Sequence, residues 1–516
     1  MKRLKVNFWG KLYNDVPLKK KAGVSEDSST EELIISLFQL KGIDFLNDLE
    51  GSFVGAIEDI DKEVHYLFRD KLGIRNIYYT KSGNKISYSI SLEEVRQKAD
   101  NATVNIQAVY DYMTLLLVPG GDTLYTNIFK VKAGCYTRID NSGITEHAYW
   151  NATEFIKNRS DLFRAANLEK IQLRLRENLI NIMTSIKKPI GLLLSDGIDS
   201  NLIAELLNDI KVDFNAYTMV SPRTTYEKLI EKRIHALKVK KTSFIPFEQI
   251  DLLDFLNNIA EPYPFTDVYI IKQLLEKMNQ CGMNACLTGE GADELGGYRE
   301  YIHMAKLAQL LNEKEHLRYE NTYEGKYISG RHIPGFTEYE KSNILVMSNR
   351  CENSYRIIYD IMYEIEGNTI EDMYYKFLNL DMKLRLPELL LHRLDIISLQ
   401  CNIDLVFPFL GTKVVEEILQ QPRTSMISSK GAKRAFKTIL SNYVNVDDYS
   451  KMGFGETYAG ELTVQTRNLY AQELKVRIDT QPICEFVKSR CVKEIIEKND
   501  RKSWLIFSLN NWLKGK

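Results

Sequence analysis

The stretch PIGLLLSDGIDSNLIAELLNDI, residues 189–210, decides the fold class of this chain. It begins with a short apolar run, passes through the polar turn SDGIDS at 195–200, and continues with the apolar spacing of a helix. A buried strand, a glycine-containing turn and a helix make up one half of a β-α-β unit. The stretch therefore predicts an α/β fold built on a doubly wound parallel sheet.

Further signals of the same kind surround this stretch. The residues 168–186 have a helical pattern, and the apolar runs at 215–220 and 284–289 are typical of buried parallel strands separated by helical stretches. After residue 300 the strand signals fade, and we expect helices to dominate to the C-terminus. The sequence thus predicts an α/β domain with a helical extension over residues 165–516.

The first 150 residues have a different texture. Runs rich in β-branched and aromatic residues at 53–60, 63–70 and 76–91 predict strands, with a turn at Lys-Ser-Gly-Asn inside the last run. Ser29 followed by acidic residues predicts the start of a helix. We expect a β-rich domain over residues 1–150 and a join near 151–165.

Composition limits the function classes. The chain has 516 residues, a formal net charge of −1, 44% apolar residues and 27% charged residues, which excludes a disordered or fibrous protein. A balanced charge gives no electrostatic reason to expect nucleic acid as a ligand. No apolar run is long enough to span a membrane, and the first residues do not resemble a secretory signal. Seven cysteines without a C-x-x-C spacing predict free thiols in a reducing cytoplasm.

The turn at 195–200 carries groups that suit a phosphate. At the start of a helix the backbone N–H groups face outward together and favour an anion. Ser195 and Ser200 add hydroxyl donors, Gly197 permits close approach of the backbone, and Asp199 could hold Mg²⁺ against phosphate oxygens. The alternative is a polar turn that caps a helix and binds nothing.

A second glycine-containing segment follows the strand expected at 284–289. LTGEGADELGGY, residues 287–298, contains the carboxylates Glu290, Asp293 and Glu294. Crowded carboxylates repel one another, so a divalent cation or a cationic substrate group is the expected neutraliser. Both turns would lie at the carboxyl edge of one sheet, where open α/β sheets bind ligands. A solvated acidic loop is the alternative.

Taken together, these two segments resemble the ATP-pyrophosphatase loop and the acidic loop of the asparagine synthetase family. The resemblance runs in order through roughly residues 45–456 and includes further matching segments: 49–61, 68–79, 116–134, 147–150, 384–398, 407–410, 430–440 and 451–456. It implies an N-terminal domain like that of the Ntn-hydrolase glutaminases, followed by a parallel-sheet ATP-pyrophosphatase domain. It also implies an enzyme that adenylates a carboxylate with ATP, releases pyrophosphate, and transfers the acyl group to an amine.

The resemblance assigns roles residue by residue. ATP binding falls on Ser195, Gly197, Asp199, Ser200 and Gly289, and Mg²⁺ binding on Asp199 and Asp293. Glu290 matches the acidic residue near the reacting acyl group. Lys433 matches the lysine that stabilises charged intermediates, and Lys451 is a further basic candidate, while the neighbouring Lys430, Arg434 and Lys437 leave the register open by one turn.

Three features depart from the family pattern. Asp196 stands where the family has a glycine, and a carboxylate there would repel a triphosphate unless it points away or binds a metal. The acidic loop reads ELGGY, one residue shorter than usual. Asp404 and Val406 replace a Glu-x-Arg pair, which removes the arginine expected to bind an acidic amino-acid substrate.

The first domain lacks the residue that glutaminases of this family need. They use an N-terminal cysteine as the nucleophile, whereas Lys2 and Arg3 follow Met1 here and the first cysteine is Cys135. Lysine and arginine cannot supply thiolate chemistry. The spacing before the first helix is also too short for the glutamine-binding loops. We expect a structural relic without glutaminase activity.

Three hypotheses follow. The first is an ATP-dependent amide-forming ligase that uses no glutamine, as in β-lactam synthetases, carbapenam synthetases and lasso-peptide cyclases, with a small molecule or a peptide supplying the carboxylate and the amine. The second is an ammonia-dependent asparagine synthetase, favoured by Glu290, where the β-lactam type has a tyrosine. The third is a catalytically inactive binding protein. ATP and Mg²⁺ are the expected cofactors, and the expected protein partners are a second copy of the chain or other biosynthetic proteins.

Overall fold

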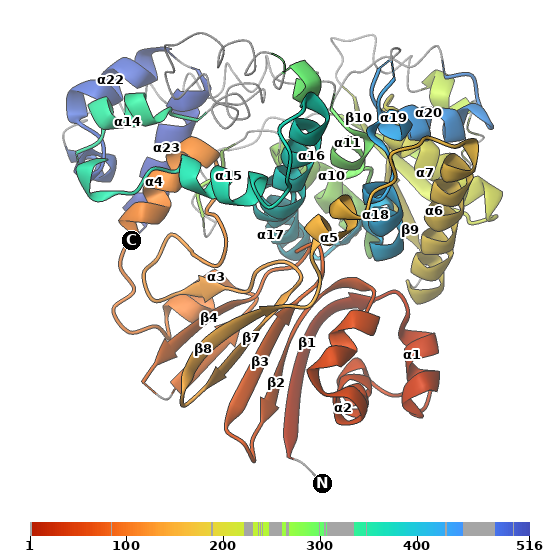
Figure 1. The fold of residues 1–516 in the computed structure, drawn as a ribbon, viewed down its shortest axis with the longest axis horizontal. Coiled ribbons are helices and arrows are strands. Elements are labelled where there is room, and N and C mark those ends of the chain that lie inside the picture. The colour runs from red at the N-terminus through yellow and green to blue at the C-terminus, as the bar shows by residue number, and fades with distance from the viewer. Residues whose placement is uncertain are drawn as a thin grey trace.

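A computed structural model gives the fold (Figure 1). It describes residues 3–83, 85–186, 189–220, 231–235, 237, 239, 241–246, 261–264, 268–298, 300–303, 306, 335–346, 348–428, 431–446, 480–498 and 500–515.

The N-terminal part is built on an antiparallel sheet with the strand order β1-β2-β3-β7-β8. Its strands are β1 (Leu4–Leu12), β2 (Gly51–Asp59), β3 (Val64–Arg69), β7 (Cys135–Asp140) and β8 (Gly143–Ala148). Successive side chains of a strand point to opposite faces. Phe53 and Ile57 of β2 accordingly belong to one core cluster, and Val54 and Ala56 belong to another. Both faces of this sheet are therefore covered.

Helices cover one face and a smaller sheet covers the other. The helices are α1 (Asp15–Ala22) and α2 (Thr30–Lys41) (Figure 1). Helix α2 begins where the sequence predicts, because the Ser29 side chain accepts from the Glu32 N–H and the Glu32 carboxylate accepts from the Ser29 N–H. The smaller sheet has the order β5-β4-β6, from β4 (Tyr78–Ser82), β5 (Lys85–Ser89) and β6 (Phe129–Lys130).

The C-terminal part is built on a parallel sheet with the order β11-β10-β9-β12-β13. Its strands are β9 (Ile190–Leu193), β10 (Asn215–Val220), β11 (Lys241–Pro246), β12 (Ala285–Leu287) and β13 (Asp404–Val406). The chain adds strands outward from β9 on one side and then restarts at β12 on the other. The strand order thus reverses between β9 and β12, where doubly wound sheets bind ligands beyond their carboxyl ends.

The predicted fold class is confirmed, but the sequence missed two of these strands. β11 lies in a stretch between predicted strands that the sequence predicts to be helical. β13 lies in the half of the chain where helices are expected to dominate. β13 is only three residues long, and its place in the sheet comes from pairing with β12. The division into units 1–150 and 165–516 stays a prediction.

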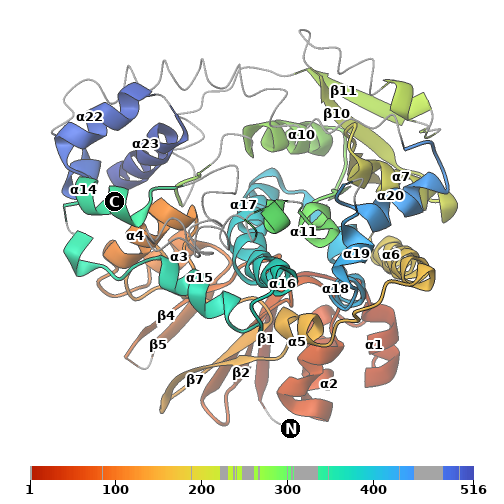
Figure 2. The same cartoon turned by 45° about the horizontal axis from the view of Figure 1, so that its top comes forward.

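Helices surround the parallel sheet and continue beyond it (Figure 2). The α-helices are α3 (Leu92–Arg96), α4 (Ile106–Leu115), α5 (Ala152–Lys157), α6 (Ala165–Ser185), α7 (Ile198–Asp209), α10 (Val268–Gln280), α11 (Ala292–Gly296), α14 (Glu338–Ile344), α15 (Tyr355–Met362), α16 (Ile370–Leu380), α17 (His392–Cys401), α18 (Thr412–Leu419), α19 (Arg423–Met426), α20 (Arg434–Ser441), α22 (Ser489–Lys498) and α23 (Arg501–Lys514). A π-helix, η4 (Asp381–Leu391), joins α16 to α17, and short 3₁₀ turns are η1 (Gly42–Asp48), η3 (Ser348–Arg350), η5 (Pro408–Leu410) and η7 (Pro482–Glu485).

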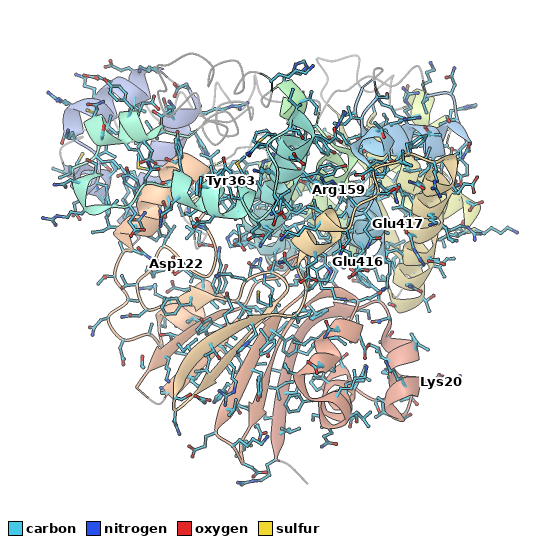
Figure 3. The ribbon with its side chains drawn as sticks, in the orientation of Figure 1. Lys20, Asp122, Arg159, Tyr363, Glu416 and Glu417 are labelled. Atoms are coloured by element: carbon cyan, nitrogen blue, oxygen red, sulfur yellow. The ribbon has the colours of Figure 1, made fainter. Side chains whose placement is uncertain are left out.

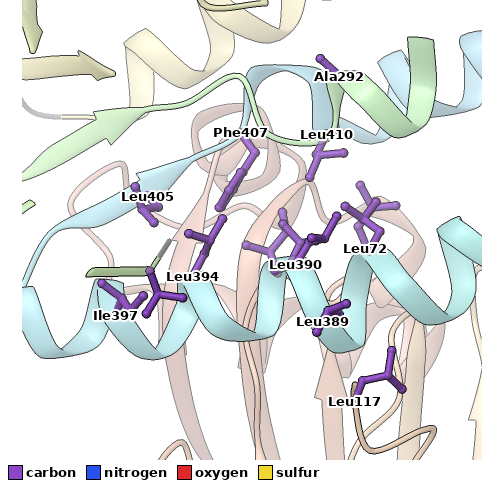
Figure 4. Close-up of a cluster of buried hydrophobic side chains, with 14 of the residues drawn as sticks. Leu72, Leu117, Ala292, Leu389, Leu390, Leu394, Ile397, Leu405, Phe407 and Leu410 are labelled. Carbon is purple, nitrogen blue, oxygen red and sulfur yellow. The ribbon is translucent and has the colours of Figure 1, made fainter. Parts of the chain in front are cut away.

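The two parts share a hydrophobic core. Leu72 and Leu117 of the N-terminal part belong to the same cluster as Leu389 of η4 and Leu394 of α17 (Figure 4). Polar contacts cross the same boundary. The Trp150 indole N–H, for example, donates to the Glu416 carboxylate on α18 at 3.1 Å. Figure 3 labels Glu416 on the side of the parallel-sheet part that faces the N-terminal sheet. The N-terminal part is therefore packed against the parallel-sheet part rather than tethered to it.

No helix within the described residues has the length and apolar character needed to cross a membrane. The seven cysteines are free thiols, as the sequence predicts.

Candidate active site

The turn between β9 and α7 is held by its own side chains. The Gly197 N–H donates to the Ser195 hydroxyl at 3.1 Å, and the Ser195 N–H donates to the Ser200 hydroxyl at 3.1 Å. The Asn201 side-chain amide donates to the carbonyls of Ser195 and Gly197 at 2.8 and 2.7 Å. The two serine hydroxyls thus brace the turn, and the start of α7 lies at the carboxyl end of β9, as the sequence predicts.

Asp196 points into the protein. Its side chain is 0% exposed, and its Oδ1 lies 2.6 Å from Nε of Arg233, which is also buried. A carboxylate at this position must point away from a bound triphosphate or bind a metal. The structure shows the first arrangement, with an arginine as the counter-charge.

The acidic loop after β12 approaches the turn closely. A Cβ atom added at Gly289 would lie only 2.9 Å from Cβ of Asp199 and 3.4 Å from the Ser200 nitrogen. Only glycine fits at that distance without displacing a neighbour. Gly289 therefore allows the two segments to meet where the strand order reverses, and α11 starts three residues later.

Lys433 joins the two segments. Its Nζ lies 2.6 Å from Oδ2 of Asp199, in the first turn of α7, and 2.8 Å from Oδ1 of Asp293, in the first turn of α11. The family resemblance predicts that Asp199, Asp293 and Lys433 share one site. The structure brings the three side chains together, although 234 residues separate Asp199 from Lys433.

The backbone of Lys433 is fixed by the same loop. Its φ is +59°, a left-handed conformation that is uncommon for a residue with a side chain. Its N–H donates to the Gly296 carbonyl at 3.0 Å, and a Cβ at Gly296 would lie 2.7 Å from Cγ of the lysine. The end of α11 thus positions both the backbone and the side chain of Lys433 at the start of α20.

The charge on Lys433 is stabilised in place. Burial alone would lower the pKa of its ammonium group, but the two aspartates outweigh burial and hold the pKa above its usual value. The sequence predicts that a divalent cation or a cationic substrate group neutralises these carboxylates. The ammonium group of Lys433 supplies part of that positive charge.

The other two carboxylates of the acidic loop also face arginines. Oε1 of Glu290 lies 3.9 Å from Nη2 of Arg393, on α17. Glu294 accepts from Nη1 of Arg385 at 3.0 Å and from the Tyr298 hydroxyl at 2.9 Å. Glu294 is buried and anchors the loop to η4, whereas Glu290 and Asp293 remain partly exposed.

The carboxylates of this site are not grouped closely enough to hold a metal ion by themselves. Within the described ranges, no three His, Cys, Asp or Glu side chains are placed to do so. Asp199 nevertheless has a buried Oδ1 with no hydrogen-bond partner. Mg²⁺ is commonly held by one or two carboxylates together with substrate phosphates, so Asp199 and Asp293 fit that cation when nucleotide supplies the other ligands.

Asp404 and Val406, which replace the family's Glu-x-Arg pair, have structural roles. Oδ1 of Asp404 lies 2.6 Å from Nη2 of Arg75 in the N-terminal part, and Val406 is a buried residue of β13. Asp404 thus belongs to the contact between the two parts, and Val406 to the sheet.

Sequence reasoning missed two site residues, and one predicted residue is not described. Arg393 lies inside the matching segment 384–398, but no role was assigned to it, and the one signal for Arg233 is Asp196, a carboxylate that needs a buried cation. Lys451 lies outside the described residues, and so do Lys430 and the segment 451–456.

Comparison with protein-family models finds a match for each part of the chain. A family model described as "Glutamine amidotransferase domain" matches residues 1–150, and one described as "Asparagine synthase" matches residues 175–514. The chain belongs to the asparagine synthase family.

Individual relatives are distant. The chain is 23% identical to a protein named "Putative asparagine synthetase [glutamine-hydrolyzing] 2" from Methanocaldococcus jannaschii, over 57% of this chain and 59% of that protein. It is 24% identical to "Asparagine synthetase [glutamine-hydrolyzing] 1" from Bacillus subtilis, over 57% and 48%, and 23% identical to "Amidase chry2" from Gibberella zeae, over 55% and 45%. The matched region spans only about half the length of these relatives.

Proposed function

We propose that this protein is an ATP-dependent amide-forming ligase. A substrate carboxylate oxygen attacks the α-phosphorus of ATP, which forms an acyl-adenylate and releases pyrophosphate. A substrate amine then attacks the acyl carbon, AMP leaves, the amine loses a proton, and an amide results. The observation that carries this proposal is the contact of Lys433 with Asp199 and Asp293 at the point where the strand order reverses.

Each part of the site has a role in this scheme. The N–H groups at the start of α7 bind the phosphate chain, as helix N-termini do for anions. The ammonium group of Lys433 stabilises the extra negative charge that develops on the α-phosphate and later on the acyl group. Glu290, close to Arg393, is placed to orient the reacting amine or acid.

Asp199 and Asp293 would hold Mg²⁺ together with the nucleotide, and the cation would neutralise charge on the phosphates during pyrophosphate release. Oδ2 of Asp199 contacts Lys433, whereas Oδ1 has no hydrogen-bond partner and would bind the Mg²⁺ ion. One carboxylate can in this way link the lysine to the nucleotide.

We propose that the enzyme does not use glutamine. Cys135 is the first cysteine in the chain, and it lies buried on β7. Burial raises the pKa of its thiol to about 11, which is unfavourable for a nucleophile at neutral pH. The amine would then come from a small molecule, a peptide or free ammonia. The free thiols favour a reducing compartment, and we place the enzyme in the cytoplasm. Its proposed protein partners are other biosynthetic proteins or a second copy of the chain.

An ammonia-dependent asparagine synthetase is the second candidate. Glu290 favours it, as does the similarity to proteins named asparagine synthetase, while the buried Val406 in place of an arginine disfavours aspartate as the substrate. Incubation with ATP, aspartate and ammonium chloride separates the candidates: asparagine appears with the second and not with the first. A protein that binds nucleotide but turns nothing over is the remaining hypothesis.

Nucleotide binding tests the site without knowledge of the acid or the amine. We expect the magnesium complex of α,β-methylene-ATP to bind in calorimetry. Asp199→Asn and Asp293→Asn should each weaken it by about tenfold or more, because phosphate charge is then poorly compensated. Asp209→Asn, at the far end of α7, is the matched control and should bind as the wild type does. Wild-type affinity in both site variants would refute the proposed site.

A further inference from the structure

Asp196 and Asp199 lie three residues apart in one turn, but their carboxylates are paired in different directions. Asp199 faces the loop that follows β12, through Lys433. Asp196 faces Arg233, in the helical residues 231–235 that follow β10. β10 and β12 flank β9 on opposite sides. The turn is therefore held from both sides of the strand that precedes it.

The pair of Asp196 and Arg233 lies beneath the partly exposed residues of the turn. The side chain of Asp196 is 0% exposed and that of Arg233 is 6% exposed, whereas Ser195, Gly197 and Asp199 are all partly exposed. A carboxylate in this position would repel a triphosphate bound to the turn, since charges interact strongly where water is scarce. With the guanidinium 2.6 Å away, the pair contributes little net charge.

We propose that Arg233 is a positioning residue of the nucleotide site. It holds Asp196 inside the protein and compensates its charge, so that the turn 195–200 presents N–H groups to the phosphates and no unbalanced carboxylate. Arg233 makes no contact with the nucleotide in this scheme. The inference rests on the proposed function, because it assumes that the turn binds the phosphates of ATP.

A charge-rescue experiment tests this role. Binding of magnesium α,β-methylene-ATP is measured by calorimetry for the wild type, Arg233→Met and the double variant Asp196→Asn/Arg233→Met. Arg176→Met serves as the control, since Arg176 pairs with Asp209 on the exposed surface near the far end of α7. Thermal melting followed by circular dichroism verifies that each variant is folded.

We expect Arg233→Met to weaken binding by about tenfold or more, and the double variant to recover to within about threefold of the wild type. If the ion pair itself were required to brace the turn, this recovery would not occur, because the double variant lacks the ion pair entirely. If Arg233→Met does not fold, Arg233→Gln removes the charge while keeping a hydrogen-bond donor, and the same criteria apply.

The outcomes separate the two proposals. If the wild type does not bind the analogue, the proposed function fails and this inference falls with it. If the wild type binds, and folded Arg233→Met binds equally well, the positioning role alone is refuted. A folded double variant that fails to recover also refutes it.

Discussion

Lys433 donates to Asp199 and Asp293, and this shared contact organises the candidate site. The lysine is nearly buried, its backbone is held in a left-handed conformation by Gly296, and its pKa stays above the usual value because of the two carboxylates. A cation fixed in this way needs little rearrangement when negative charge develops beside it.

Removal of this cation should affect rate more than binding. We expect Lys433→Ala to bind magnesium α,β-methylene-ATP while losing about 100-fold or more in the rate of ATP cleavage, comparable to the loss of one electrostatic contact in a transition state. Rates are measured as pyrophosphate release. Lys437→Ala, one turn further along α20, is the control. If Lys437→Ala is inactive and Lys433→Ala is not, the role belongs to the other lysine.

At the scale of the elements, the site depends on the close approach of two strand-to-helix turns. Gly289 after β12 faces the first turn of α7, and the available distance leaves no room for a side chain. The geometry that brings Asp293 toward Asp199 is therefore set by backbone packing as well as by Lys433.

A single methyl group should disturb this approach. In Gly289→Ala the new Cβ would lie 2.9 Å from Cβ of Asp199, so α7 and the acidic loop must move apart. We expect a loss of about tenfold or more in affinity for the nucleotide analogue, with a fold that remains intact by circular dichroism. Gly515→Ala, where the nearest atom is 3.6 Å away, is the matched control. Unchanged affinity in Gly289→Ala would show that the contact is not required.

Local patterns in the sequence were sufficient for some elements and not for others. β9, its turn and α7 follow from an apolar run, a polar turn and helical spacing, and these elements form as predicted. β13 has only three residues and no periodic pattern of its own, so it is defined by its pairing with β12. The contact of Lys433 with Asp199 spans 234 residues, and it could be inferred only through the family resemblance. Arg233 could not be inferred at all, because no local rule specifies which arginine meets Asp196.

At the scale of the whole molecule, the N-terminal part is joined to the rest by ion pairs of the buried Arg69 and Arg75. Arg75 donates from Nη1 to Asp395 at 3.0 Å and from Nη2 to Asp404 at 2.6 Å, and Arg69 donates to Glu388 at 3.1 Å. The shared hydrophobic core includes Leu389 and Leu394, the sequence neighbours of Glu388 and Asp395 (Figure 4). Their arrangement indicates that the N-terminal part stabilises the parallel-sheet part.

Loss of one such arginine should destabilise the protein. Arg75→Met leaves the buried Asp395 without its guanidinium partner, which we expect to lower the free energy of unfolding by about 3 kcal/mol. Urea denaturation followed by tryptophan fluorescence measures the change. Arg3→Met, which removes an exposed ion pair with Asp61, should leave the midpoint unchanged. Equal midpoints for Arg75→Met and the wild type would contradict a stabilising role for the contact.

The N-terminal part should also lack glutaminase chemistry. At pH 8 only about a thousandth of a thiol with a pKa near 11 is ionised, so Cys135 should resist iodoacetamide in the folded protein while the exposed Cys281 reacts. Mass spectrometry of tryptic peptides measures the alkylation of both cysteines.

Incubation with glutamine should release no glutamate above the uncatalysed rate. Glutamate release that a glutamine-analogue alkylator blocks would overturn this expectation.

We propose that ATP is cleaved between its α and β phosphates at the site formed by Asp199, Asp293 and Lys433. The most direct measurement supplies α-labelled ATP with the low-molecular-weight fraction of cells that express this chain, and separates the labelled products. We expect labelled AMP with an equal amount of pyrophosphate, and no such product from Asp199→Asn or Asp293→Asn. Labelled ADP with orthophosphate, or labelled AMP formed equally well by both variants, would contradict it.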